Sequence, residues 1–116
     1  MRVTPGARSQ LLDVVAALVR DDLEHAAHFV LEIDDGIPEV YSVLSYLYGQ
    51  QGRTEDAIAA TLRVLELPGN ERLLYSSYKN LAIFYRDQGR LDEAMRAAQE
   101  ALVRAPESER AGMEEL

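Results

Sequence analysis

The sequence predicts an all-α protein made of stacked helical hairpins, and three observations support this prediction. Segment 52–57 (Gly-Arg-Thr-Glu-Asp-Ala) recurs as segment 89–94 (Gly-Arg-Leu-Asp-Glu-Ala). Each copy lies between two stretches whose apolar residues recur at helical spacing, and no stretch alternates as a strand would. Repeats with a period of 20 to 50 residues are typical of proteins that stack one supersecondary unit on the next.

The first hairpin is predicted over residues 5–36. Thr4 followed by Pro5 is typical of an N-cap with proline at the first helical position. We expect the first helix to span 5–20, with Asp21 and Asp22 interrupting the pattern and capping a second helix that ends at Gly36. The apolar residues of this hairpin are Leu11, Leu12, Val15, Leu18, Leu23, Ala26, Phe29, Val30 and Ile33.

The second hairpin begins at Pro38, which suits the opening turn of a helix. Gly52 provides the left-handed stop, and Thr54 is the expected N-cap of the next helix, which ends before Pro68 and Gly69. The apolar faces carry Tyr41, Leu44, Leu47 and Tyr48 on the first helix, and Ala57, Ile58, Thr61, Val64 and Leu65 on the second.

The third hairpin is predicted from Asn70, as the cap of a longer helix that Gly89 ends, through a final helix from Leu91 to about residue 105. The inner face of this last helix is predicted to hold Ala94, Ala97, Ala98, Ala101 and Leu102. Residues 107–116 follow Pro106 as a short helical stub, a partial capping helix.

Composition limits the possible functions. The 116 residues suit one domain spanning 1–116, and the net charge of −8 without a basic stripe argues against nucleic-acid binding. There is no cysteine and no apolar run of the roughly 20 residues that span a bilayer, so we expect a cytoplasmic protein without membrane insertion. Nothing in the sequence calls for a cofactor.

Catalytic and metal-binding alternatives have weak support. His25 and His28 lie one helical turn apart with acidic neighbours, a pattern that can bind zinc but that a charged surface helix also produces by chance. The paired carboxylates of segments 55–56 and 92–93 are better explained as helix-start charges that favour the macrodipole. Because no phosphate loop, nucleophile elbow or zinc-protease motif occurs, we do not expect an enzyme or a metal site.

The chain resembles the tetratricopeptide repeat (TPR) family, in three repeats over approximately 7–37, 38–70 and 71–106, the first of them degenerate. Residues of the third unit that fit the family pattern are Tyr78, Leu81, Ala82, Tyr85, Gly89, Ala94, Ala98, Ala101 and Pro106. Those of the second are Tyr41, Leu44, Ser45, Tyr48, Gly52, Ala57, Val64 and Leu65, with Thr61 where the family prefers a ring. The resemblance implies a right-handed superhelix (α-solenoid).

In this family the first helix of each hairpin lines a concave groove that holds a peptide or helix of a partner protein. The resemblance therefore implies groove residues Ser42, Tyr46, Gly49 and Gln50 in the second unit, Ser76, Lys79, Ile83 and Arg86 in the third, and Leu11, Val15 and Leu18 in the first. We expect Tyr46 and Arg86 to matter most, because aromatic and arginine side chains most often anchor interfaces.

Three alternatives stay open. Lys79 and Arg86 could simply solubilise an acidic protein. The uncapped ends could pair to form a homo-oligomer, or the chain could be part of a longer protein. A chaperone tail is not an expected ligand, since the positions that would grip its carboxylate hold Leu11, Val15, Val43, Ser76 and Asn80.

Overall fold

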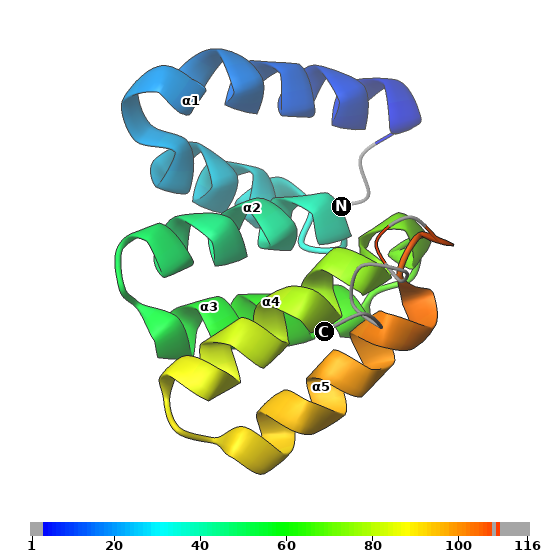
Figure 1. Ribbon diagram of the computed structural model, residues 1–116. Coiled ribbons are helices and arrows are strands. Elements are labelled where there is room, and N and C mark those ends of the chain that lie inside the picture. The colour runs from blue at the N-terminus through cyan, green and yellow to red at the C-terminus, as the bar shows by residue number, and fades with distance from the viewer. Residues whose placement is uncertain (1–3, 108, 110–116) are drawn as a thin grey trace.

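The computed structural model describes the backbone of residues 4–107 and 109, and their side chains except those of residues 9 and 11–22. Its helices are α1 (Pro5–Ile33), α2 (Pro38–Gln50), α3 (Thr54–Glu66), the 3₁₀ helix η1 (Glu71–Leu73), α4 (Leu74–Asp87) and α5 (Leu91–Arg104) (Figure 1). No strand occurs in this part of the chain, so the predicted all-α class is confirmed. None of these helices is long and apolar enough to cross a bilayer.

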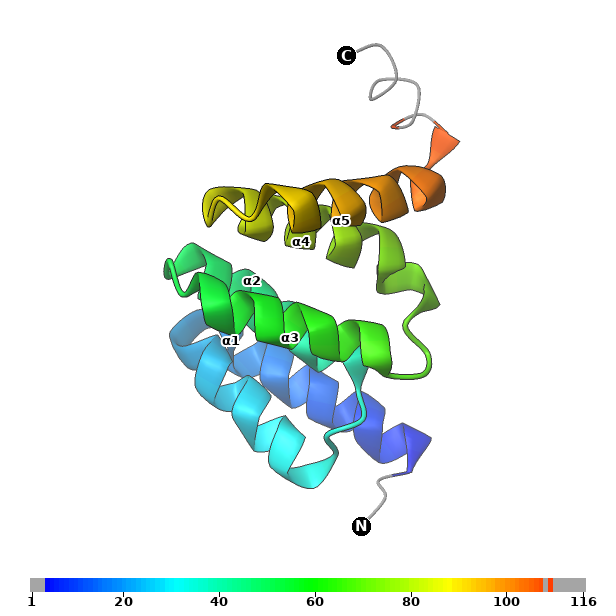
Figure 2. The ribbon, with the colours of Figure 1, turned by 90° about the horizontal axis from the view of Figure 1, so that it is seen from below.

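Helix α1 corrects the prediction of two separate helices over 5–20 and up to Gly36. The helical assignment runs without interruption from Pro5 to Ile33, although Figures 1 and 2 show α1 folding back on itself near its middle. Arg8 Nε donates to Asp34 Oδ2 at 2.7 Å, whereas a straight helix would separate these residues by about 39 Å. The hairpin is therefore present, but Asp21 and Asp22 do not interrupt the helix. A helix commonly stops at a residue in the left-handed conformation, and glycine enters that conformation at a lower energetic cost than aspartate does.

Of the predicted caps, Thr4 and Asn70 occupy cap positions and Thr54 does not. The Thr4 hydroxyl accepts from the Ala7 N–H at 3.2 Å, as expected of an N-cap. Thr54 is instead the first helical residue of α3, after a cap residue that makes no side-chain capping bond. Asn70 is the cap residue of η1, which leads into α4, and its backbone carbonyl accepts from the Leu73 N–H at 2.8 Å. Its side-chain amide turns backward and donates to the Val64 carbonyl at 2.9 Å, so it also stabilises the end of α3.

The glycine stops predicted for the second and third hairpins are confirmed and have the same geometry, whereas α1 ends at Ile33, before the predicted stop Gly36, which is not left-handed. Gly52 has φ 73° and Gly89 has φ 74°. The following N–H groups, of Arg53 and Arg90, each donate at 2.8 Å to the carbonyl of the tyrosine five residues earlier. This is the Schellman arrangement that a left-handed glycine allows at a helix end.

The buried core follows the seams between successive hairpins, as the repeat predicts (Figure 2). One cluster joins α1, α2 and α3 and contains Ala26, Ala27, Val30, Ile37, Val40, Leu44, Tyr48, Ala57 and Ala60. The other joins α3, α4 and α5 and contains Ile58, Leu81, Tyr85, Ala94 and Ala97. The partly buried Phe84 packs against both clusters, so one side chain links the two seams.

Small residues lie where the helices of a hairpin cross. The Ser45 and Thr61 hydroxyl oxygens are 2.5 Å apart, and Thr61 also donates to the Ala57 carbonyl at 2.8 Å. Thr61 thus replaces the ring preferred in the family with a buried hydrogen bond between α2 and α3. In the third hairpin the partly buried Ala82 packs against the cluster that holds Ala94.

The last helix departs from prediction at two positions. Ala94, Ala97 and Ala101 are buried, as expected, whereas Ala98 is exposed and Leu102 is only half-buried. Among the described helices, α5 lies at the edge of the array, next to α4 (Figures 1 and 2). Of the predicted stub, Glu107 and Glu109 are helical, and residues 110–116 lie outside the described part of the chain.

Candidate interaction surface

The face predicted to bind a partner is formed by α2 and α4, which approach each other closely. A Cβ atom added at Gly49 of α2 would lie only 3.1 Å from Cε1 of the Phe84 ring of α4. Such a contact is tighter than ordinary packing allows, so glycine permits this approach. We call the exposed residues of these two helices the α2–α4 face.

All six of the principal groove residues predicted for the second and third units lie on these two helices. Ser42, Tyr46 and Gln50 lie on α2, and Lys79, Ile83 and Arg86 lie on α4. Tyr46 is 62% exposed, although tyrosine rings usually bury most of their surface. Gln50, Lys79 and Arg86 are also exposed, whereas Ser42 and Ile83 are half-buried. Leu11, Val15 and Leu18 have side chains outside the described set.

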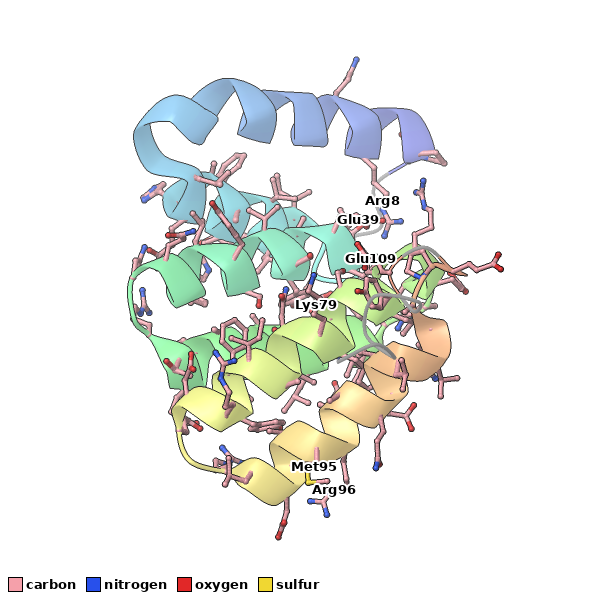
Figure 3. The ribbon with its side chains drawn as sticks, viewed as in Figure 1. Arg8, Glu39, Lys79, Met95, Arg96 and Glu109 are labelled. Carbon is pink, nitrogen blue, oxygen red and sulfur yellow. The ribbon has the colours of Figure 1, made fainter. Side chains whose placement is uncertain are left out.

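The α4 half of this face carries positive charge that is weakly neutralised. Lys79 makes no ion pair with the described residues, and its ammonium lies 5.7 Å from the centre of the Tyr75 ring (Figure 3). Among the described residues, the Arg86 guanidinium forms an ion pair with its sequence neighbour Asp87, at 3.2 Å. Exposed pairs of this kind contribute little to stability, so both cations remain free to meet a carboxylate of a partner.

The remaining tyrosines have the structural roles predicted for them. Tyr48 and Tyr85 are each 8% exposed and belong to the two core clusters, whereas Tyr41, Tyr75 and Tyr78 are half-buried. The Tyr75 hydroxyl donates to the Glu109 carboxylate, which fixes the start of the C-terminal stub beside α4. Among the tyrosines that the structure describes, Tyr46 is therefore the one whose side chain is exposed.

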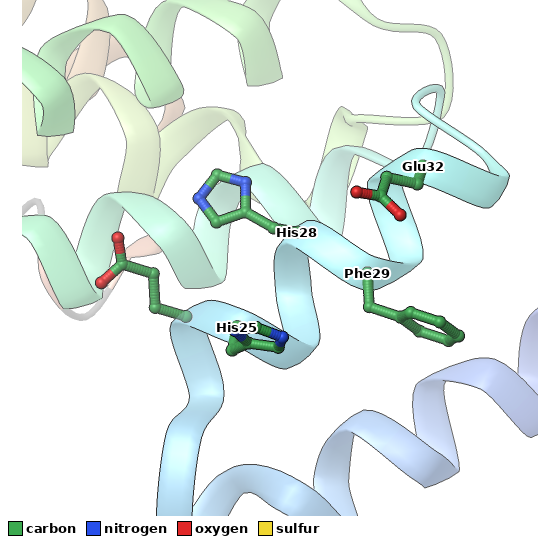
Figure 4. A pocket seen from close by; sticks show the side chains of 5 residues that line it. His25, His28, Phe29 and Glu32 are labelled. Atoms are coloured by element: carbon green, nitrogen blue, oxygen red, sulfur yellow. The ribbon is translucent and has the colours of Figure 1, made fainter.

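Three hollows occur elsewhere on the described surface, and none of the six predicted groove residues lines them. One hollow of about 370 Å³ is lined by Glu24, His25, His28, Phe29 and Glu32 of α1 (Figure 4). The His28 Nε2 atom lies 3.0 Å from the Tyr48 hydroxyl, so this imidazole joins α1 to α2. The described residues contain no group of three or more side chains placed to hold a metal ion.

The turns after α2 and α4 carry one arrangement that sequence reasoning missed, which we call the turn latch. It consists of a glutamine and an arginine of the turn and a glutamate of the preceding hairpin. The members are Gln51, Arg53 and Glu24 in the first latch, and Gln88, Arg90 and Glu55 in the second.

In the first latch the Arg53 guanidinium stacks 4.3 Å from the centre of the Tyr48 ring. It donates to Glu24 at 2.8 Å and to Asp56 at 2.9 Å. The hydrogen bond from Arg53, together with one from Gln51, holds the pKa of Glu24 below its ordinary value. The turn of the second hairpin is thereby bound to the first hairpin.

The second latch repeats this geometry one hairpin later. The Arg90 guanidinium lies 4.6 Å from the centre of the Tyr85 ring and donates to Glu93 at 2.7 Å. Gln88 donates to Glu55 at 2.6 Å, and Arg90 lies 3.8 Å from the same carboxylate. The repeated Gly-Arg pair, five residues after a core tyrosine, was the signal in the sequence for this role.

The fold and its repeated turns define a helical-repeat protein in which each hairpin contacts the next. Two models of the tetratricopeptide repeat family match it, one over residues 38–71 and the other over residues 76–105. Because they cover more than half of the sequence, the chain belongs to the tetratricopeptide repeat family. Repeats of this family generally mediate protein–protein interaction. No curated protein and no solved structure gives a match.

Proposed function

We propose that this chain is a protein-interaction scaffold that holds a peptide or helix of a partner protein on the α2–α4 face. The observation that carries the proposal is the exposure of Tyr46, 62%, on a helix whose other aromatic side chains pack inward. A large ring on an open surface offers apolar contact area together with a hydroxyl, the combination enriched at binding hot spots.

The charge of the face favours an acidic partner segment. Lys79 and Arg86 lie on α4, and the carboxylate nearest Arg86 is its own neighbour Asp87. An Asp or Glu side chain of a partner would form charge-assisted hydrogen bonds with these groups, and the long-range attraction would speed association. Tyr46 would supply the apolar anchor beside them.

Pull-down from lysate tests this proposal with a double variant of the face, Tyr46→Ala with Arg86→Glu. The matched control changes exposed residues of the other helices, Leu62→Ala with Glu100→Arg. We expect the face variant to lose proteins that the wild type and the control both retain, as identified by mass spectrometry. Equal recovery of the same proteins by all three would refute binding on the α2–α4 face.

A further inference from the structure

Helix α4 carries exposed positive charge in a chain that is acidic overall. Residues 74–86 include Lys79 and Arg86 and no acidic residue, whereas the whole chain has 20 acidic and 12 basic residues. Both side chains are exposed, and the acid that ends α4, Asp87, pairs with Arg86. Helix α2 has one charged residue, Glu39, in its first turn. The positive charge of the α2–α4 face therefore comes from α4.

The two cations of α4 are spaced by one heptad, with an aliphatic side chain between them. Lys79 and Arg86 are seven residues apart, which corresponds to about 10.5 Å along a helix and about 20° around it. Ile83 follows Lys79 by four residues and precedes Arg86 by three, so it lies on the same side of α4. Its side chain is half-buried and therefore partly accessible. We call these three residues the α4 stripe.

We propose that the partner segment on the α2–α4 face is an acidic α-helix that lies along α4 and presents two carboxylates seven residues apart, with an apolar residue between them. This inference rests on the function proposed above and specifies the chemistry of the ligand. The two carboxylates pair with Lys79 and Arg86, and the apolar residue covers Ile83. Tyr46 of α2 contacts the bound helix from the side.

The spacing of the α4 stripe fits a helix better than an extended segment. Side chains on one side of a β-strand are about 7 Å or about 13 Å apart, so two of them do not match the two cations. A polyproline II segment repeats every three residues, about 9.3 Å, but its two intermediate side chains point elsewhere and leave Ile83 uncovered. A helix places an acid at positions n and n+7, and an apolar residue at n+4 or n+3 for a parallel or antiparallel arrangement.

Selection from a displayed library of random peptides, each long enough for four helical turns, tests the inference on the immobilised full chain. We expect the enriched peptides to carry acids at n and n+7 with an apolar residue at n+3 or n+4. Circular dichroism should show that they become helical when bound. The face variant Tyr46→Ala with Arg86→Glu should no longer retain them.

Charge exchange with one enriched synthetic peptide then tests the register, with fluorescence anisotropy as the measure of affinity. Lys79→Glu and Arg86→Glu should each weaken binding at least ~5-fold, because an attraction becomes a repulsion. Replacing one peptide acid with lysine should restore binding to one variant, and replacing the acid seven residues away should restore binding to the other.

The matched control is Arg96→Glu, which makes the same charge change at an exposed arginine of α5. It should leave the affinity nearly unchanged at physiological salt, where distant exposed charges are screened. Circular dichroism checks that each variant keeps the helical content of the wild type. Lys79→Gln and Arg86→Gln replace any reversal that does not, and each should still lower the affinity for the peptide.

The outcomes separate this inference from the proposed function. Enriched peptides that need Tyr46 and Arg86 but carry acids at another spacing, or stay non-helical when bound, would overturn the inference and leave the proposed function standing. Acids at n and n+7 without rescue by charge exchange would do the same. An absence of enriched peptides, or enriched peptides that the face variant still retains, would overturn both.

Discussion

At the scale of single residues, Arg53 and Arg90 show how one side chain can serve both its own turn and the neighbouring hairpin. Each guanidinium covers a buried tyrosine ring, pairs with an acid at the start of its own helix and approaches an acid of the preceding hairpin. The planar fork of arginine suits several partners at once, which a lysine ammonium would meet less well. The helix-start acids are thus more than macrodipole partners.

The lowered pKa of Glu24 predicts a pH dependence of stability. A carboxylate whose pKa is depressed on folding stabilises the protein above its unfolded pKa, and this contribution is lost as the pH falls through the folded pKa. Thermal unfolding followed by circular dichroism should therefore show a smaller decrease in midpoint on acidification in Glu24→Gln than in the wild type. In an Arg53→Gln background the same change should matter less, and an equal effect in both backgrounds would show that Arg53 is not the cause.

The left-handed turn residues give a second prediction at this scale. Gly52→Ala places a Cβ on a residue with φ 73°, which should destabilise the fold by about 1–2 kcal/mol in denaturant unfolding. The control is Gly6→Ala in the first turn of α1, where an added Cβ meets nothing within 4 Å. That variant should be neutral or slightly stabilising. Equal losses in the two variants would contradict the role assigned to the turn.

At the scale of elements, the helix bounds of the second and third hairpins could be predicted from glycine, proline and apolar spacing. Gly52 and Gly89 act locally, through backbone sterics, so sequence alone identifies them. The corner of α1 could not be predicted in the same way, because no residue there determines whether a helix ends or bends. The contacts that accompany the bend are tertiary: the Arg8–Asp34 ion pair joins the two ends of α1, and Ala26, Ala27 and Val30 pack in one cluster with residues of α2.

Because α4 and α5 pack closely within the third hairpin, we expect α5 to tolerate larger side chains only on its exposed side. Ala94→Leu inserts a side chain into the cluster with Leu81 and Tyr85 and should cost about 1–3 kcal/mol by overpacking. Ala98→Leu, on the exposed side of the same helix, should stay within about 0.5 kcal/mol of the wild type. Urea unfolding of both variants measures the difference, and the assignment of the inner face would be wrong if Ala98→Leu were the more damaging.

At the scale of the whole molecule, the protein is a series of layers held by seams. Each seam combines apolar packing with a turn latch at one end, and Phe84 connects the two core clusters. The same design leaves exposed side chains such as Tyr46, Lys79 and Arg86 of the α2–α4 face outside both core clusters. A helical-repeat scaffold can therefore expose binding surfaces without weakening its core.

The sequence could predict which helices carry the residues of the candidate surface. It could not predict how those helices approach each other. Family resemblance placed Tyr46, Lys79 and Arg86 on the first helices of their hairpins, and the structure places them on α2 and α4. The close approach of Gly49 to the Phe84 ring is a contact between two hairpins, and the spacing of residues within one helix does not predict it. The turn latch was missed because its three members come from two hairpins.

Site-specific photo-crosslinking in cells tests the central claim most directly, because it reports which face of the intact protein a partner contacts. A photoreactive side chain replaces Tyr46 of α2 in one variant and Leu62 of α3, 40% exposed, in another. If the α2–α4 face binds a partner, the Tyr46 position should give a discrete protein adduct that Arg86→Glu diminishes, and the Leu62 position should not give that adduct. An adduct formed equally from both positions, or only from Leu62, would contradict the proposed function.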